Sequence, residues 1–168
     1  MTQTNKEHFI DLLGRFDHAM LVTRRGSELR SRPMAIGGHT DDGRIRFITR
    51  DDSAKLRELE QHAQVNVAMQ GADRYLSISG NARISKDRNL IDDAWQNSQS
   101  TWFSDGRDDP HVVVLEVVPT YAEYWDQAED GVTELVLDAA RSAIGVESEE
   151  ESDAEEHGSV NLRDTPLT

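Results

Sequence analysis

Short strand-forming segments separated by compact turns are the feature that most restricts the fold of this chain. Apolar and β-branched residues fill His18 to Thr23, Val65 to Met69 and His111 to Val118. Turn formers stand between such segments, among them Arg25-Gly26-Ser27-Glu28 and Gln70-Gly71-Ala72-Asp73. Strands that follow one another through short turns pair antiparallel, as hairpins do. The chain is therefore predicted to be mainly β.

Further extended segments support a closed sheet. They are Leu29 to Ile36, Arg44 to Arg50, Tyr75 to Ser85 and, after an interruption at Pro119, Tyr121 to Asp126. Pro33 cannot donate a ladder hydrogen bond, so its strand is predicted to lie at an edge or to be interrupted. Gly80 indicates a bulge or a barrel corner inside a long strand. Six or more antiparallel strands favour a small β-barrel decorated by helices, because closure removes exposed strand edges.

Helical periodicity places a few helices among these strands. The predicted helices lie at residues 5–14, from Ser53 to about Ala63, at Asp87 to Asn97 and at Val132 to Ala143. Asp52 or Ser53 would cap the second helix, with Leu56 and Leu59 inside and Glu58 facing water. Trp95 is expected in the core on the apolar side of the third helix.

The domain prediction follows from a change of composition near the C-terminus. Residues 1–145 are expected to form one domain that ends with the last predicted helix. Seven of the ten residues from Glu147 to Glu156 are acidic, so residues 146–158 are predicted to be a solvated, flexible linker. Residues 159–168 form a tail, with a short strand at Ser159-Val160-Asn161-Leu162 as one interpretation.

Charge and composition exclude several classes of function. The net charge of -14 argues against nucleic-acid binding, which depends on Lys and Arg that neutralise phosphates. No apolar run approaches the roughly 18 residues needed to span a bilayer, and Met1 to Glu7 has no signal-peptide pattern. We therefore expect a cytoplasmic protein without membrane partners. The chain has no Cys, and its six His lack ligand spacing, so no metal site is expected.

Basic and hydroxyl residues gather around the predicted start of the second helix. Arg30 and Arg32 project from one face of an extended segment, and Thr49, Ser53 and Lys55 follow along the chain. The N-terminus of a helix offers unpaired N–H groups and the positive end of the helix dipole. If the two strands lie close together, these residues would bind an anion such as a phosphomonoester.

Ordinary surface ion pairing is the alternative interpretation of the same cations. The chain carries 32 Asp and Glu residues against 18 Lys and Arg, so carboxylate partners are abundant. The residue types alone leave both interpretations open.

The order of several motifs resembles that of the pyridoxamine 5'-phosphate oxidase-like flavoproteins. The motifs are Leu29-Arg30-Ser31-Arg32-Pro33-Met34, then Gly43-x-Ile45-x-Phe47-Ile48-Thr49 with Ser53-x-Lys55, then Tyr75-x-Ser77-Ile78-Ser79-Gly80-x-Ala82. Two later segments are similar to the general stress protein 26 branch. They are Trp102-Phe103-x-x-Gly106-x-x-Asp109-Pro110 and Pro119-x-x-Ala122-Glu123-Tyr124-Trp125-Asp126. The resemblance runs from about residue 5 to residue 145.

This resemblance implies an FMN-binding split barrel, usually a homodimer with FMN at the subunit interface. The positions that match the phosphate-binding residues of the family are Arg32, Thr49, Ser53 and Lys55. The resemblance also implies that backbone and side chains around Pro33, Met34 and Ile48 line the flavin, whose apolar body suits an interface groove. The C-terminal substrate-phosphate site of the true oxidases has no recognisable counterpart here.

Trp102 is a further candidate for the flavin pocket. It stands in a segment rich in polar residues and glycine, where an indole ring could stack on an isoalloxazine. Interface packing without ligand contact is the alternative role for this residue.

Two classes of function follow from the resemblance. The first is an oxidoreductase that uses FMN on an unknown small substrate, with NAD(P)H as a candidate electron donor. The second is a non-catalytic stress protein that binds or senses flavin. A third interpretation keeps the fold and replaces FMN by another cofactor, such as heme or a deazaflavin. No catalytic residue can be assigned from the sequence.

Overall fold

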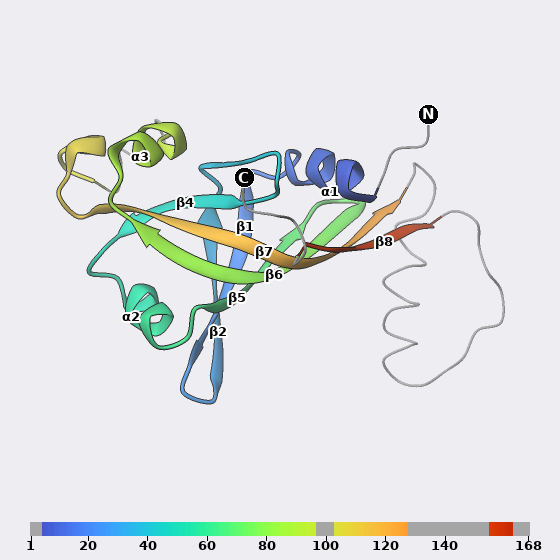
Figure 1. Ribbon diagram of the computed structural model, residues 1–168, viewed down its shortest axis with the longest axis horizontal. Coiled ribbons are helices and arrows are strands. Elements are labelled where there is room, and N and C mark those ends of the chain that lie inside the picture. The colour runs from blue at the N-terminus through green and yellow to red at the C-terminus, as the bar shows by residue number, and fades with distance from the viewer. Residues whose placement is uncertain (1–4, 97–102, 128–154, 163–168) are drawn as a thin grey trace.

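The computed structural model describes residues 5–96, 103–127 and 155–162, which form one eight-stranded antiparallel sheet with three α-helices (Figure 1). The strands are β1 (His18–Arg25), β2 (Glu28–Ala35), β3 (Gly38–His39), β4 (Ile45–Arg50), β5 (Gln64–Gln70), β6 (Arg74–Ser85), β7 (Val112–Gln127) and β8 (Glu155–Asn161). The helices are α1 (Asn5–Leu13), α2 (Ala54–Gln61) and α3 (Arg88–Ala94), and Gly106–Asp108 forms a 3-10 turn. The mainly β prediction is confirmed.

The sheet closes on itself through a short passage of the chain. Its strand order is β2-β1-β5-β6-β7-β4-β3, so the two ends of the order are consecutive in sequence. Only Ile36 and Gly37 separate them. The Ile36 N–H donates to the Asp17 carbonyl at 2.8 Å, and the Gly37 N–H donates to the Arg46 carbonyl at 2.8 Å. The chain thus passes from one end of the sheet to the other and completes the predicted barrel.

A bulge joins the two longest strands, β6 and β7. The register shifts between Ser79 and Gly80, where β7 contributes Thr120 as an extra residue. A Cβ atom on Gly80 would lie 2.4 Å from the Val118 carbonyl oxygen, so the close approach requires glycine. The bulge predicted at Gly80 is confirmed. The interruption predicted at Pro119 is wrong, because the proline lies at the bulge, where a missing N–H is tolerated and β7 continues.

Two apolar clusters lie on opposite sides of β4. The barrel interior takes Ile45 and Phe47 of this strand and is covered at one end by α1, from which Phe9, Leu12 and Leu13 are buried. The smaller cluster lies under α3 and consists of Ile48, Ile91, Ala94, Phe103, Val112 and Val114, with Trp95 packed against it. Alternation along β4 therefore sends Ile48 away from the barrel interior.

The barrel is joined through Ile36 and Gly37 and not along β2, so β2 keeps the open edge that Pro33 predicts. Within the described residues it pairs with β1 alone, and Pro33 lies opposite Met20 in the register. The helices agree with the sequence pattern as well, since α2 begins directly after Ser53. No helix among the described residues is long and apolar enough to cross a membrane.

Strand β8 returns from the C-terminal part of the chain and pairs with the second half of β7. Gly158 permits this, because a Cβ atom there would lie 2.2 Å from the Tyr124 ring. Leu162 is buried in the barrel core, and Val160 packs against it. The last part of the segment expected as a linker, from Glu155, is therefore paired strand. The helix expected at Val132 to Ala143 lies outside the described residues.

Candidate functional site

The junction between β4 and α2 contains an unsatisfied buried hydroxyl. Ser53 occupies the N-cap position of α2 in an extended conformation, but its side chain makes no capping hydrogen bond. Its Oγ is buried and has no hydrogen-bond partner among the described residues. Buried polar atoms are nearly always paired in proteins, so this hydroxyl is available to a partner outside the described residues.

Lys55 lies beside this hydroxyl, in the first turn of α2. Its Nζ donates to Thr49 Oγ1 at 2.7 Å, and within the described part of the chain no carboxylate is at ion-pair distance from it. Burial lowers the pKa of Lys55, and the positive charge of Arg32 lowers it further, while Glu58 acts in the opposite direction. The lysine is therefore a half-buried cation without its own counter-ion.

Arg32 reaches the same corner from β2 and is held by a buried carboxylate. Its Nη2 donates to Glu58 Oε2 at 3.0 Å, and its Nη1 donates to Thr23 Oγ1. Thr23 in turn donates to Glu58 Oε2 at 2.6 Å, and Arg30 lies 3.9 Å from the other carboxylate oxygen. The two strands are thus close enough for the predicted convergence of cations on the start of α2.

Glu58 is the site residue that the sequence interpretation placed wrongly. It was expected to face water, whereas only 6% of its surface is exposed. The hydrogen bond from Thr23, followed by the charge of Arg32, holds the pKa of Glu58 below its usual value in spite of burial. Its position one turn after Lys55, next to the apolar stripe of α2, was the available signal. Arg30 and Arg32 on β2 are the cations that a carboxylate at this position binds.

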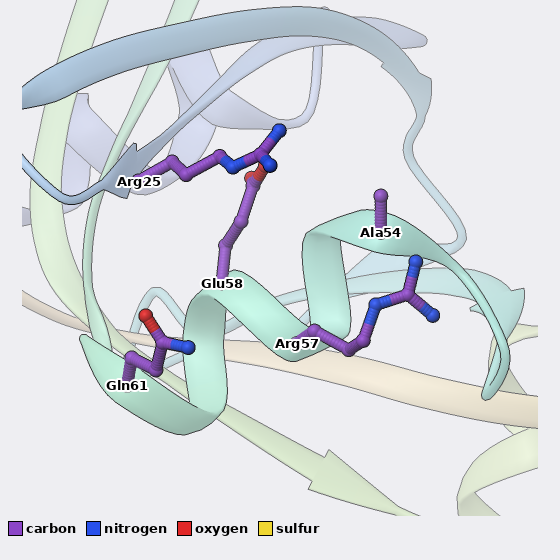
Figure 2. Close-up of a pocket in the computed structure, with 5 residues that line it drawn as sticks. All are labelled: Arg25, Ala54, Arg57, Glu58 and Gln61. Carbon is purple, nitrogen blue, oxygen red and sulfur yellow. The ribbon is translucent and has the colours of Figure 1, made fainter.

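A cavity of about 230 Å³ opens beside this cluster (Figure 2). It is lined by Arg25, Ala54, Arg57, Glu58 and Gln61. Figure 2 shows the Glu58 side chain rising from α2 toward Arg25, with the Arg57 side chain running below the small Ala54 side chain. Among the described residues neither arginine forms an ion pair. The cavity therefore lies beside the first turn of α2, and its lining holds two arginines together with the buried Glu58.

The remaining predicted site residues lie at different distances from this junction. Pro33 is exposed on β2, and Met34 is half-buried against the barrel core. The Ile48 side chain belongs to the cluster under α3, so any contribution to a ligand beside Thr49 would come from its backbone. Trp102 lies outside the described residues.

These residues fit a phosphate group. An orphaned hydroxyl, an ammonium without a counter-ion and the free N–H groups at the start of a helix are the donors that a phosphate accepts from. Arg32 and Thr49 add donors on the facing strands. Simple ion pairing accounts for Arg30 and Arg32 but, within the described residues, not for Lys55 or Ser53.

Comparisons with known proteins agree with this geometry. A family model described as pyridoxamine 5'-phosphate oxidase like matches residues 4–150. General stress protein 26 of Bacillus subtilis (strain 168) is 30% identical over 122 residues, which cover 70% of this chain and 85% of that protein. The crystal structure of general stress protein 26 from Bacillus anthracis str. Sterne matches with a TM-score of 0.66 at 25% identity, covering 71% of this chain and 92% of that chain. The general stress FMN/FAD binding protein of Xanthomonas citri matches with a TM-score of 0.62 at 26% identity, covering 75% of this chain and 90% of that chain.

The family model matches residues 4–150 of a chain that folds as an antiparallel β-sheet, so this chain belongs to the pyridoxamine 5'-phosphate oxidase-like family. Within that family the similarity is to proteins named general stress protein 26.

Proposed function

We propose that this chain is a flavin-binding protein that holds FMN by its phosphate at the β4–α2 junction. The observation that carries the proposal is the pair formed by the orphaned Ser53 hydroxyl and the uncompensated Lys55 ammonium. The description of the Xanthomonas citri protein as FMN/FAD binding supports a flavin as the ligand. Arg32 and Thr49 complete the set of phosphate donors.

The same placement supports roles for the residues beside the phosphate. Pro33 on β2 and the backbone at Ile48 flank the junction and would line the flavin ring system. Bound FMN would supply two-electron redox chemistry, and the chain would orient it and exclude water. On this proposal the protein is an oxidoreductase acting on a small substrate, with NAD(P)H as the candidate electron donor. A flavin that stays bound without turnover would instead define a flavin carrier or sensor.

A homodimer is part of the proposal. The register places Met20, Pro33 and Tyr121 on the outer face of the sheet, where Met20 is 40% and Tyr121 is 38% exposed. A groove of about 530 Å³ on this face runs from Leu29, which is 75% exposed, to Thr120. This apolar, weakly charged sheet face suits a partner subunit. Sedimentation or light scattering of the flavin-loaded protein would test this, and a strict monomer that retains FMN would contradict it.

The experiment that tests flavin binding is a titration with FMN, followed by its visible spectrum, in the wild type and in a double variant. Arg32→Ala with Lys55→Ala removes two charge-assisted phosphate contacts, each worth about 1.5 to 3 kcal/mol. We expect the dissociation constant to rise by about a hundredfold or more. Addition of NAD(P)H to the loaded protein then tests turnover through bleaching of the flavin band.

A matched control removes the same charge elsewhere. Arg83 and Arg88 are both exposed, and the double variant Arg83→Ala with Arg88→Ala lowers the net charge equally. We expect it to bind FMN as the wild type does. Equal weakening in both double variants, or unchanged affinity in the Arg32 and Lys55 variant, would remove the phosphate assignment.

A further inference from the structure

A buried carboxylate stands among the cations that would bind the phosphate. Glu58 is 6% exposed, and its Oε2 accepts hydrogen bonds from Thr23 at 2.6 Å and from Arg32 at 3.0 Å. Its pKa lies below the usual value, so the group is an anion throughout the neutral range. A site built only to attract phosphate would have no use for a negative charge in this position.

The ion pairs show which cations the Glu58 carboxylate binds. Arg30 also pairs with Glu28 at 3.4 Å, whereas Glu58 is the one carboxylate at ion-pair distance from Arg32 within the described residues. Lys55 is repelled by Arg32, and Glu58 offsets part of that repulsion. Glu58 therefore keeps two neighbouring cations compatible while no ligand is bound.

The same carboxylate is within reach of an incoming ligand. Glu58 and Ala54 both line the 230 Å³ cavity, and Ala54 directly follows Ser53 (Figure 2). Glu58 follows Ser53 by five positions, which is a rise of about 7.5 Å along the helix axis. A phosphate at the start of α2 would lie inside one Debye length of this negative charge, in a partly buried corner where screening is weak.

We propose that Glu58 is an internal counter-ion that opposes the flavin phosphate and thereby keeps flavin binding reversible. Without ligand it holds Arg32 and compensates its charge. When the phosphate binds, Arg32 is shared between the two anions, and the repulsion between phosphate and carboxylate lowers the affinity. This inference rests on the proposed function, because it assigns the regulation of the same site. On this proposal the protein binds and releases flavin readily, because the charge of a single carboxylate limits its affinity for FMN.

Glu58→Gln tests the proposal, because it keeps the side-chain length and the bond to Thr23 while it removes the charge. We expect the variant to bind FMN about tenfold more tightly, since both charges of the phosphate are relieved of the repulsion from the carboxylate. Riboflavin, which lacks the phosphate, should bind the variant and the wild type equally. The ligand-free variant should melt at a lower temperature, because Arg32 loses the one carboxylate at ion-pair distance from it within the described residues.

Glu60→Gln is the matched control. Glu60 is exposed on the same helix, and its substitution changes the net charge by the same amount. We expect FMN affinity and melting temperature to stay at the wild-type values. Glu58→Asp retracts the carboxylate from Arg32 by one methylene group, and it should give an intermediate gain in FMN affinity if Glu58→Gln proves too unstable to purify.

The outcomes separate this inference from the proposed function. Weaker FMN binding in Glu58→Gln would overturn it and make Glu58 a residue that positions Arg32 for the phosphate. Equal tightening by Glu60→Gln would also overturn it, as an effect of net charge. If no form binds FMN, the proposed function fails, and inorganic phosphate then tests Glu58 alone. A larger thermal stabilisation of Glu58→Gln than of the wild type by phosphate would still support the counter-ion, and an equal one would not.

Discussion

Two clusters of arginine and glutamate lie at opposite ends of β4, and only in one of them does every cation have a carboxylate partner. At the start of the strand, Glu116 of β7 is 8% exposed and accepts from Arg46 at 3.1 Å and from Arg44 at 3.5 Å. Arg44 also pairs with Asp42 at 2.8 Å, and Arg46 lies 3.8 Å from Asp93. Each cation of this cluster has a carboxylate of its own in addition to the shared one.

The cluster at the end of β4 has the same components and a different balance. Glu58 is buried as deeply as Glu116, and two arginines approach it in the same way. Here, however, Lys55 has no carboxylate at ion-pair distance, and the Ser53 hydroxyl has no partner within the described part of the chain. Within the described residues, the Glu58 cluster therefore has more hydrogen-bond donors than acceptors.

The difference teaches which observation marks a ligand site. A buried ion pair by itself indicates neither function nor stability, because its Coulomb energy is largely offset by desolvation. What distinguishes the two ends of β4 is the unpaired donor, which an external anion would satisfy. The predictions below test whether the Glu116 cluster is structural and the Glu58 cluster functional.

The largest effect is expected from Glu116→Ala. It leaves two partly buried arginines without their shared partner, and breaking such a pair costs about 3 kcal/mol of folding stability. FMN affinity should not change, because this cluster contacts nothing at the start of α2. Denaturant unfolding and an FMN titration on the same preparation measure both quantities.

Asp93→Ala is the control for that measurement. The Asp93 side chain is 68% exposed and lies 3.8 Å from Arg46, so its removal should cost less than about 1 kcal/mol. A large loss of FMN affinity in folded Glu116→Ala would show that the two clusters are coupled along β4.

Lys55→Met is expected to act in opposite directions on stability and on binding. The ligand-free protein should be as stable as the wild type or more so, because a desolvated cation repelled by Arg32 is removed. FMN affinity should fall by about 1.5 to 3 kcal/mol, the value of a charge-assisted hydrogen bond. Loss of both quantities together would mean that Lys55 is mainly structural.

The pH dependence checks the same assignment. Because the pKa of Lys55 lies below the ordinary value, its ammonium is less favoured in the ligand-free fold than in the unfolded chain. Stability of that fold should therefore rise as pH increases through the lowered pKa, while FMN affinity falls over the same range. Neither change should occur in Lys55→Met. A wild-type affinity that is flat up to the ordinary lysine pKa would contradict the assignment.

The sequence was sufficient for the fold because local patterns and turns were consistent. Pro33 predicted the edge strand, and Gly80 predicted the bulge, each from a steric property of the residue itself. The prediction from Pro119 was wrong, because the effect of a proline in a strand also depends on the strand opposite. A single chain segment cannot reveal that β6 shifts register there and makes the missing N–H harmless.

The site was predictable only in part. Arg32, Thr49, Ser53 and Lys55 could be grouped from spacing and from the family resemblance, and the structure brings them together around one helix start. Glu58 could not, because helical periodicity assigns a charged residue to the solvent side. Its burial depends on Thr23 and the arginines of β2, which are distant from it in the sequence. They meet α2 only through the tertiary fold.

The smallest effect in this comparison is expected at the two helix N-caps. Ser53 and Asp87 occupy equivalent positions, but only Asp87 caps its helix, through a 2.9 Å hydrogen bond from the Asn89 N–H. Asp87→Ala should therefore cost about 1 kcal/mol of stability and leave FMN affinity unchanged.

Ser53→Ala should show the reverse. It removes a buried hydroxyl that makes no hydrogen bond, so stability of the ligand-free protein should stay the same or rise slightly. FMN affinity should fall by about 0.5 to 1.5 kcal/mol, the net value of one hydrogen bond to the phosphate. Thermal melts and FMN titrations of the two alanine variants give four numbers. If Ser53→Ala destabilised the free protein as Asp87→Ala does and left FMN affinity intact, the serine would be an ordinary helix cap. The Glu58 cluster would then lose the donor that most clearly distinguishes it from the Glu116 cluster.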